Sequence, residues 1–254
     1  MRTLLISVDG MRPDAITDNR HFKDIIQKSA YTLEARTVIP SVTLPAHLSM
    51  FHSVDPSRHG ITNNTYTPMA RPINGICEVL RPLLKQCAFF HGWDELRDLA
   101  RPGSTNFSYF CAGRFIGREA MNNNVTNAAI EYLNEYPTDF AFLYLGYTDW
   151  AGHQFGWMSD GYMEAISNSW ENIHKVLNNL PDDYSVIITA DHGGHDRTHG
   201  SEMPEDMTIP IIAIGPDFKP GTVFENASIK DIPPTIVKLL GVDPDPDWEG
   251  KSLF

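Results

Sequence analysis

Apolar runs alternate with amphipathic segments along this chain. Short apolar runs rich in β-forming residues occupy Thr3–Val8, Phe140–Tyr147, Val186–Ala190 and Ile209–Ile214, and Thr32–Ile39 has an extended pattern. Runs that are apolar on both faces are typical of strands in the middle of a parallel sheet. The pattern therefore predicts a largely buried sheet whose strands come from both halves of the chain.

Helical periodicity fills the stretches between these runs. It predicts helices at Phe22–Ala30, Val125–Tyr136 and Tyr162–Leu180, and a further helix after Asp231, which we expect to cap it. Alternation of strands and helices favours an α/β fold in which helices cover both faces of a mostly parallel sheet. We expect a three-layer α/β/α sandwich, formed as one domain by residues 1–254.

Residues 65–118 depart from this alternation, because prolines interrupt the segment and aromatic side chains crowd it. We expect a small cap-like insert of short strands and turns that lies over the main sheet. Its aromatic side chains would line a substrate pocket or form a small core of the insert itself.

Composition and charge narrow the classes of function. The 254 residues are 42% hydrophobic and carry a net charge of −12, so a groove that neutralises nucleic-acid phosphates is not expected. An anionic substrate would need a local positive centre, which bound cations supply. Three cysteines without metal-type spacing indicate a reducing compartment. The sequence shows no signal peptide and no run of membrane length, so we expect a cytoplasmic protein without a membrane partner; its oligomeric state is not indicated.

Three of the predicted strands run directly into an aspartate, namely Asp9, Asp149 and Asp191. For Asp9, the alternative is an aspartate that caps the following turn. Open α/β folds place their chemistry at the carboxyl edge of the sheet, so we expect the three carboxylates to converge there. Their mutual repulsion would be unfavourable without cations or raised pKa values.

Histidines follow two of these strand ends within a few residues, at His153, His192 and His199. For the Asp-His loop after the strand at 186–190, the alternative is a simple hydrogen-bonded pair. Imidazole nitrogens and carboxylate oxygens suit zinc. Together the six side chains form two sets of N/O ligands, which is how a two-metal phosphoryl-transfer site is built.

Thr43 lies near the start of another predicted helix, with Pro45 in its first turn. Free N–H groups and the helix dipole favour an anion at that point. The alternative is a threonine that only caps the helix. In the following loop, Arg58 and Asn64 are candidate contacts for an anion.

These residues lie in motifs that resemble the alkaline phosphatase superfamily, and within it the nucleotide pyrophosphatase/phosphodiesterase (type I phosphodiesterase) branch. The motifs are SVDG at 7–10, PSVTLPAH at 40–47, HGITNN at 59–64, DWAGH at 149–153, DHGGH at 191–195 and THG at 198–200. The C-terminal DIPPTIVKLLGV and EGKSL are also similar to the tail of that superfamily. The motifs appear in the expected order from residue 7 to residue 252.

The resemblance implies two divalent metal sites, with zinc expected and manganese as the alternative. One metal would be held by Asp149, His153 and His199, and the other by Asp9, Asp191 and His192 together with the oxygen of Thr43. Thr43 would be the nucleophile that forms a covalent phosphothreonine, and Asn64 would contact a non-bridging phosphate oxygen. His195 is an alternative to His199, although Gly200 and the IPIIAIGP strand favour His199.

The resemblance predicts a phosphodiesterase that acts on a small phosphorylated substrate. LPAH follows Thr43 where the branch has an aromatic residue and then PNH, so the nucleoside pocket is expected to differ. The Cys/Ser-x-Pro-x-Arg pattern of formylglycine sulfatases is lacking. A phosphomonoesterase or phosphonate hydrolase stays as the rival, with Arg12, Arg58 or Arg197 as extra cationic contacts. A phosphomutase and a non-catalytic metal- or phosphate-binding module are further alternatives.

Overall fold

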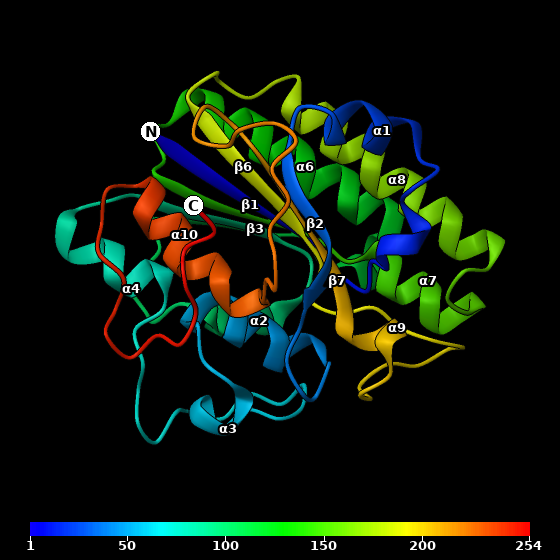
Figure 1. The fold of residues 1–254 in the computed structure, drawn as a ribbon, viewed down its shortest axis with the longest axis horizontal. Helices are drawn as coiled ribbons and strands as arrows, with labels where there is room; N and C mark the ends of the chain where they lie inside the picture. Colours follow the sequence, from blue (N-terminus) through cyan, green and yellow to red (C-terminus); the bar gives the residue numbers. More distant parts are fainter.

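A seven-stranded sheet forms the middle layer of the computed structural model, which describes residues 1–254 (Figure 1). The strands in chain order are β1 (Arg2–Val8), β2 (Ala30–Arg36), β3 (Cys87–His91), β4 (Phe107–Phe110), β5 (Phe140–Leu145), β6 (Tyr184–Thr189) and β7 (Thr208–Ile214). Their order across the sheet is β2-β7-β6-β1-β5-β3-β4. Strand β7 pairs antiparallel with β6 and β2, whereas all other pairs are parallel. The mostly parallel sheet of the prediction is confirmed.

Helices cover both faces of this sheet, which completes the expected three-layer sandwich. The longer helices are α1 (Arg20–Ile26), α2 (Thr43–His52), α6 (Arg118–Glu135), α7 (Tyr147–Phe155), α8 (Asp160–Leu177) and α10 (Ile232–Leu239). The short ones are α3 (Pro56–His59), α4 (Ile76–Leu80), α5 (Gly113–Ile116) and α9 (Pro204–Met207). Figure 1 shows α1, α6, α7 and α8 on one face, and α2, α4 and α10 on the other. None of the helices combines the length and the apolarity needed to cross a bilayer.

The central strands are buried on both faces, as their largely apolar sequences predict. Every residue of β5 and β6 is buried. Phe51 of α2 packs edge-on against Phe89 and Phe142 of the sheet, with ring centroids 5.5 and 4.9 Å apart. This contact holds α2 against the sheet, and it therefore fixes the place of Thr43 at the start of that helix.

The expectation that residues 65–118 lie over the sheet is wrong for β3 and β4. Both strands extend the main sheet beyond β5. The prolines of the segment lie outside both strands, and all five residues of β3 are buried. Phe90 packs against Tyr132 of α6, at 5.9 Å between ring centroids. At least part of the aromatic-rich sequence therefore belongs to the main core, because β-forming aromatic side chains are best buried on a sheet face.

The side chain of Asp231 does not cap the helix that follows it, in contrast to the prediction. Its carboxylate accepts hydrogen bonds from the backbone N–H of Ser228 (2.8 Å) and of Lys251 (2.9 Å). Asp231 therefore holds the C-terminal EGKSL segment against α10, which is a contact between segments that sequence proximity does not reveal.

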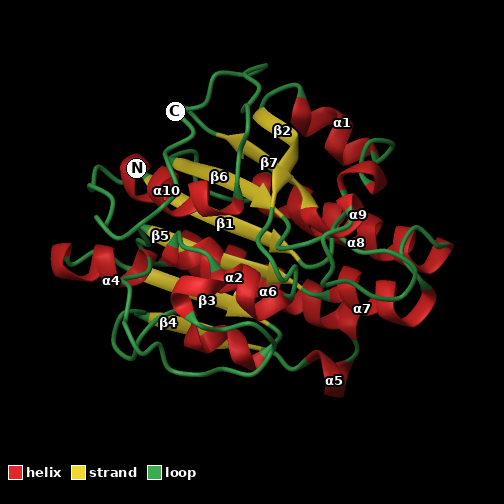
Figure 2. Ribbon diagram, turned by 60° about the horizontal axis from the view of Figure 1, so that its bottom comes forward, coloured by secondary structure: helices red, strands yellow, loops and turns green.

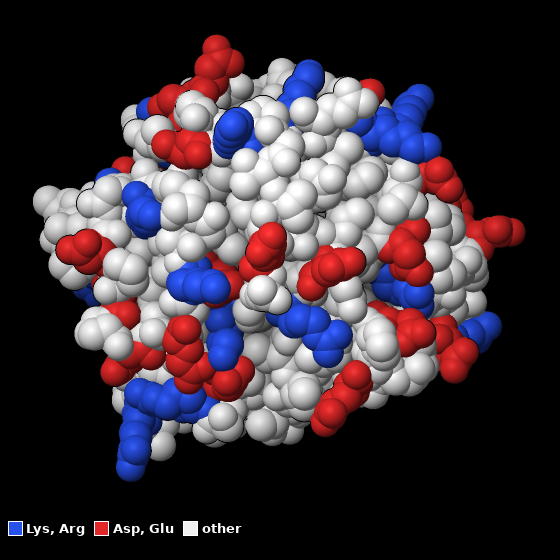
Figure 3. All heavy atoms as spheres, viewed as in Figure 1, with Lys and Arg blue, Asp and Glu red and all other residues white.

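Charged side chains are interspersed over the face drawn in Figure 3, where acidic and basic groups alternate. They form no continuous basic stripe on this face. This face therefore lacks the basic patch that binds the phosphate backbone of a nucleic acid.

Candidate metal centre

The three strand-end aspartates lie side by side at one edge of the sheet. Strand β1 is paired with both β5 and β6, with Val8 opposite Leu145 and Ser7 opposite Thr189. Because the three strands are parallel, the residues that follow them emerge at the same edge, where Figure 2 places α7 and α9. The convergence of Asp9, Asp149 and Asp191 follows directly from this register.

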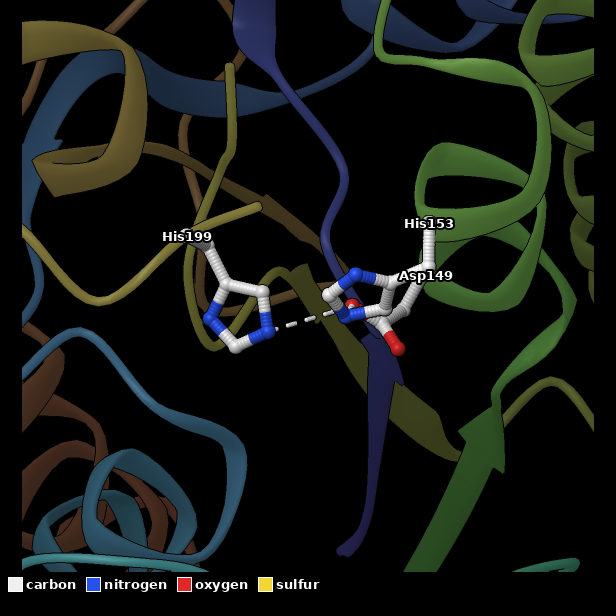
Figure 4. A group of neighbouring side chains, drawn as sticks. All are labelled: Asp149, His153 and His199. Carbon is white, nitrogen blue, oxygen red and sulfur yellow. Dashed lines mark ion pairs between the residues drawn. The ribbon is translucent and has the colours of Figure 1, made fainter. Parts of the chain in front are cut away.

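One group of side chains joins α7 to the loop after β6 (Figure 4). Nε2 of His153 lies 3.4 Å, and Nε2 of His199 3.6 Å, from Oδ1 of Asp149. Asp149 and His153 are four residues apart on α7, so both project from the same side of the helix. The Nδ1 atoms bond to backbone carbonyls, those of Arg197 (2.9 Å) and Ser41 (2.9 Å) respectively. These bonds turn both Nε2 atoms toward the carboxylate.

A second group surrounds the buried ring of His192. Its Nε2 lies 3.3 Å from Oδ1 of Asp9, 3.3 Å from Oδ2 of Asp191 and 3.2 Å from Oγ1 of Thr43. The ligand atoms of Asp9, Asp149 and His192 also lie within 4.8 Å of one another, as do those of the first group. The carboxylate of Asp149 therefore lies between the two groups.

Three carboxylate oxygens of this centre lack the partner that a cation would supply. Oδ1 of Asp9, Oδ1 of Asp149 and Oδ2 of Asp191 are buried and have no hydrogen-bond partner. Burial, followed by repulsion from Asp191 and Asp149, raises the pKa of Asp9 well above its usual range. Burial also raises the pKa of Asp191, against the attraction of His47. Divalent cations would satisfy these oxygens and favour the ionised carboxylates.

Burial favours the neutral imidazole, which is the form that binds a metal, at two histidines of the centre. Burial lowers the pKa of His192. Burial, and then the neighbouring His192, lowers the pKa of His199 to about 4. A set of imidazoles and carboxylates fits zinc, and its oxygens also fit manganese.

Thr43 is the first residue of α2, and its hydroxyl does not cap the helix. Val42 occupies the N-cap position, and no side chain caps the helix there. The hydroxyl instead faces His192, and the whole residue is only 4% exposed. Oδ1 of Asn64 accepts a hydrogen bond from the N–H of Leu44 (3.0 Å), which places the Asn64 amide at the start of α2. Thr43 therefore adjoins the group around His192, and Asn64 is bonded to the residue that follows Thr43.

Two residues in contact with the aspartates received no role in the sequence analysis. Oη of Tyr144 donates a short hydrogen bond to Oδ2 of Asp9. Nδ1 of His47 lies 2.8 Å from the carbonyl oxygen of Thr43 and 3.4 Å from Oδ2 of Asp191. His47 lies in the PSVTLPAH motif, which could have pointed to it. Tyr144 lies in an apolar strand, and only its place in β5 beside β1 brings it to Asp9.

His195, the alternative to His199, is directed elsewhere. Its Nδ1 lies 2.7 Å from Oδ1 of the buried Asp206. Two of the candidate cationic contacts also have other partners. The Arg12 guanidinium pairs with Asp14 and donates to a backbone carbonyl, and Arg58 bonds to the backbone oxygen of Arg71 and lies near Asp247. The third candidate, Arg197, is exposed.

Comparisons with known proteins agree with this picture. Residues 3–78 match the family described as type I phosphodiesterase / nucleotide pyrophosphatase, and residues 115–244, half of the chain, match the metalloenzyme superfamily. The chain is 32% identical over 94 residues to the phosphopentomutase of Proteus mirabilis. The matched segment covers 37% of this chain and 22% of the relative. It is 30% identical over 143 residues to the 2,3-bisphosphoglycerate-independent phosphoglycerate mutase of Haloquadratum walsbyi. This match covers 52% of this chain and 27% of the mutase. The chain thus spans about a quarter of the length of these curated relatives.

Solved structures share the fold at low sequence identity. Human ectonucleotide pyrophosphatase / phosphodiesterase 5 superposes with a TM-score of 0.83 at 15% identity, covering 99% of this chain and 97% of the other. The phosphonate monoester hydrolase of Silicibacter pomeroyi gives 0.76 at 15% identity, covering 99% and 75%. A putative sulfatase from Bacteroides thetaiotaomicron gives 0.80 at 14% identity, covering 99% and 73%. With half of its length matching the metalloenzyme superfamily and its fold shared with these proteins, the chain belongs to the alkaline phosphatase superfamily of metalloenzymes.

Proposed function

We propose that this protein is a metal-dependent phosphodiesterase of the nucleotide pyrophosphatase type, with Thr43 as its nucleophile. The observation that carries the proposal is the Thr43 hydroxyl, which is free of any capping role and lies 3.2 Å from His192. Beside it are three buried carboxylate oxygens without a hydrogen-bond partner. A nucleophilic hydroxyl needs activation, and cations held by these carboxylates would provide it.

Two groups of side chains would hold the cations. The first is Asp149, His153 and His199, and the second is Asp9, Asp191 and His192 with the Thr43 oxygen. When bound, the two cations would lower the pKa of the Thr43 hydroxyl and offset the charge of the phosphoryl group. Zinc is the metal that we propose from the donor set, with manganese as the alternative.

The residues of the chain account for the remaining chemistry. Oγ1 of Thr43 forms a bond to phosphorus while the bond from phosphorus to the leaving oxygen breaks, which gives a phosphothreonine and an alcohol. Water then displaces Thr43, which regains its proton as the phosphomonoester is released. Oδ1 of Asn64 accepts a hydrogen bond from the N–H of Leu44, and its separate Nδ2 hydrogens would donate to a non-bridging phosphate oxygen.

The surroundings favour a diester over a monoester. A monoester dianion carries more charge and would require further cationic contacts near the phosphoryl group. Arg12 and Arg58 are already bonded to other groups, and Arg197 is exposed. We therefore place the phosphomonoesterase and phosphonate hydrolase activities second.

A phosphomutase is a further candidate, because the curated relatives named above are mutases. A mutase returns the phosphoryl group to its product, whereas a diesterase releases it to water. Incubation of a sugar phosphate with the metal-loaded protein separates the two, since only a mutase would isomerise the substrate.

The proposed function is tested with bis-p-nitrophenyl phosphate and p-nitrophenyl phosphate, assayed with zinc or manganese added. We expect faster turnover of the diester, and Thr43→Ala should abolish it whereas Thr43→Ser should retain part of it. Metal content is measured for each variant by atomic spectroscopy. Full turnover by Thr43→Ala with its metals bound would show that the covalent route is wrong.

We also propose a reducing, cytoplasmic compartment, on the basis of cysteine usage. Cys77, Cys87 and Cys111 are all free thiols, and the first two are buried. Secreted proteins of comparable cysteine content more often pair their thiols. Location in cell fractions is the direct measurement.

A further inference from the structure

His47 lies at the centre of the contacts between α2 and the candidate metal centre. It is completely buried, one helical turn after Thr43. Its Nδ1 donates a hydrogen bond to the carbonyl oxygen of Thr43 (2.8 Å). On the other side of the ring, Nε2 lies 3.0 Å from Oγ of Ser7, which is in β1 and two residues before Asp9. The imidazole therefore joins the segment of the proposed nucleophile to the strand that leads into a proposed metal ligand.

The same imidazole also adjoins a carboxylate of the second group. Nδ1 of His47 lies 3.4 Å from Oδ2 of Asp191, one of the three buried oxygens without a hydrogen-bond partner. Asp191 has another contact that orients it, because the backbone N–H of Gly10 donates to its Oδ1 (3.1 Å). Loss of the His47 ring would therefore leave this carboxylate oriented for a metal, although it would release the backbone of Thr43.

The start of α2 depends on such contacts, because no side chain caps it. Helix ends fray when nothing holds their terminal turn. The ring of His47 packs edge-on against Phe142 and Tyr144 of β5, at 6.0 and 5.6 Å between centroids. This packing and the contact with Ser7 fix the ring between the helix and the sheet. The ring can therefore hold the first turn of α2 in one place.

We propose that His47 is a positioning residue, which holds Thr43 at the distance from the second metal group that attack on phosphorus requires. This inference rests on the proposed function, because it needs Thr43 as the nucleophile. His47 reaches Thr43 through its backbone, and it takes no part in the bonds that form and break at phosphorus. Misplacement of a reacting group by about 1 Å can lower a rate by about 100-fold. His47 would therefore act on kcat rather than on the affinity for metal or substrate.

Two substitutions at position 47 separate the roles of the two ring nitrogens. His47→Asn keeps an amide N–H near the place of Nδ1, whereas the longer side chain in His47→Gln carries its amide past that place, toward Ser7. With zinc at saturating concentration and bis-p-nitrophenyl phosphate as substrate, we expect His47→Gln to lower kcat by about 10–100-fold with little change in KM. His47→Asn should recover a large part of that loss. Zinc affinity, measured by chelator competition, should stay near that of the native protein in both variants, because Gly10 still orients Asp191.

His52→Gln is the matched control. His52 is the last residue of α2 and is also buried, and its Nδ1 donates to the carbonyl oxygen of Leu48 (3.1 Å), four residues earlier in the helix. The control loses the same kind of bond at the end of the helix opposite to Thr43, so it should keep the native kcat. Ser7→Ala covers the case in which His47→Gln does not fold. It removes only the partner of Nε2, and it should lower kcat by about three- to tenfold.

The tautomer of His47 gives a readout that does not depend on activity. In a long-range proton–nitrogen NMR spectrum, the histidine signals that are absent from His47→Asn should show a proton on Nδ1. A proton on Nε2 alone would overturn the inference, because Nδ1 could not then donate to the carbonyl oxygen of Thr43.

The remaining outcomes separate this inference from the proposed function. Native kcat in His47→Gln or in Ser7→Ala, or an equal loss of kcat in His52→Gln, would show that His47 has only a structural role, although diester turnover by the native protein would still support the proposed function. If the native protein with metals bound does not hydrolyse bis-p-nitrophenyl phosphate, the proposed function itself fails, and the positioning role fails with it.

Discussion

Tyr144→Phe is the sharpest test of how the fold prepares the metal centre. The substitution removes only Oη, which donates a hydrogen bond to Oδ2 of Asp9. The ring remains, with its edge-on contact to His47 at 5.6 Å between centroids. Asp9 then loses the group that orients it, and its Oδ1, which lies 3.3 Å from Nε2 of His192, is no longer held in place.

We expect Tyr144→Phe to lower the affinity for metal first. Loss of a hydrogen bond that orients a metal ligand typically weakens binding by about 10–100-fold. This corresponds to about 1.4–2.7 kcal/mol of binding free energy. Because Asp9 belongs to only one of the two groups, we expect one zinc to bind more weakly and the other to bind nearly as in the native protein.

Zinc affinity is measured by competition with a chromophoric chelator, and folding is followed by circular dichroism. Tyr184→Phe is the matched control: Tyr184 is also a buried tyrosine, at the start of β6, but its Oη donates to the backbone oxygen of Thr138. Tyr184→Phe should bind both metals normally. Equal zinc affinities for the native protein and Tyr144→Phe would refute the idea that Tyr144 positions Asp9.

Three further outcomes follow from the structure. Removal of divalent cations by a chelator should lower the thermal midpoint of unfolding at neutral pH, because buried carboxylates then repel one another; an unchanged midpoint on adding back zinc would contradict this. The hydrogen bond to Asp206 is the chief cause that raises the pKa of His195. This bond therefore stabilises the fold at pH values below the unfolded pKa of His195, and the added stability is lost as pH rises through the higher folded pKa. Urea unfolding should therefore show stability falling as pH rises above about 6.5, the ordinary pKa of histidine, and Asp206→Asn should flatten that slope. Gly193→Ala would place a Cβ 2.0 Å from the backbone oxygen of Glu205, so it should destabilise the protein by about 1–3 kcal/mol in the same assay, and native-like stability would show that the loop yields freely.

Much of the architecture follows from local sequence. The runs at β1, β5 and β6 are largely apolar because both of their faces are covered, and an aspartate follows each strand within four residues. Parallel strands end at a common edge, so the meeting of Asp9, Asp149 and Asp191 could be predicted without coordinates. The place of Thr43 at the start of α2 was predictable for the same kind of reason, since Pro45 is tolerated only in the first turn of a helix.

Other features depend on contacts between distant segments, and only the tertiary structure decided them. No local feature of its sequence shows whether the aromatic-rich β3 is a strand of the main sheet or a strand of an insert. Only its pairing with β5 shows that it belongs to the main sheet. His195 and His199 are four residues apart in one loop, and both are plausible ligands by sequence. The bond from His199 to the Ser41 carbonyl, and that from His195 to Asp206, determine which imidazole lies beside Asp149.

The hydrogen bond from Tyr144 to Asp9 belongs to the same class. In sequence, Tyr144 is one more apolar residue of a buried strand. Its hydroxyl becomes informative only when the β1–β5 register places it next to a carboxylate. The sequence by itself thus determined which chemical groups reach the edge of the sheet, because the residues that follow each buried run are fixed by the local sequence. Tertiary structure decided how those groups are oriented, because orientation depends on hydrogen bonds between residues far apart in the chain.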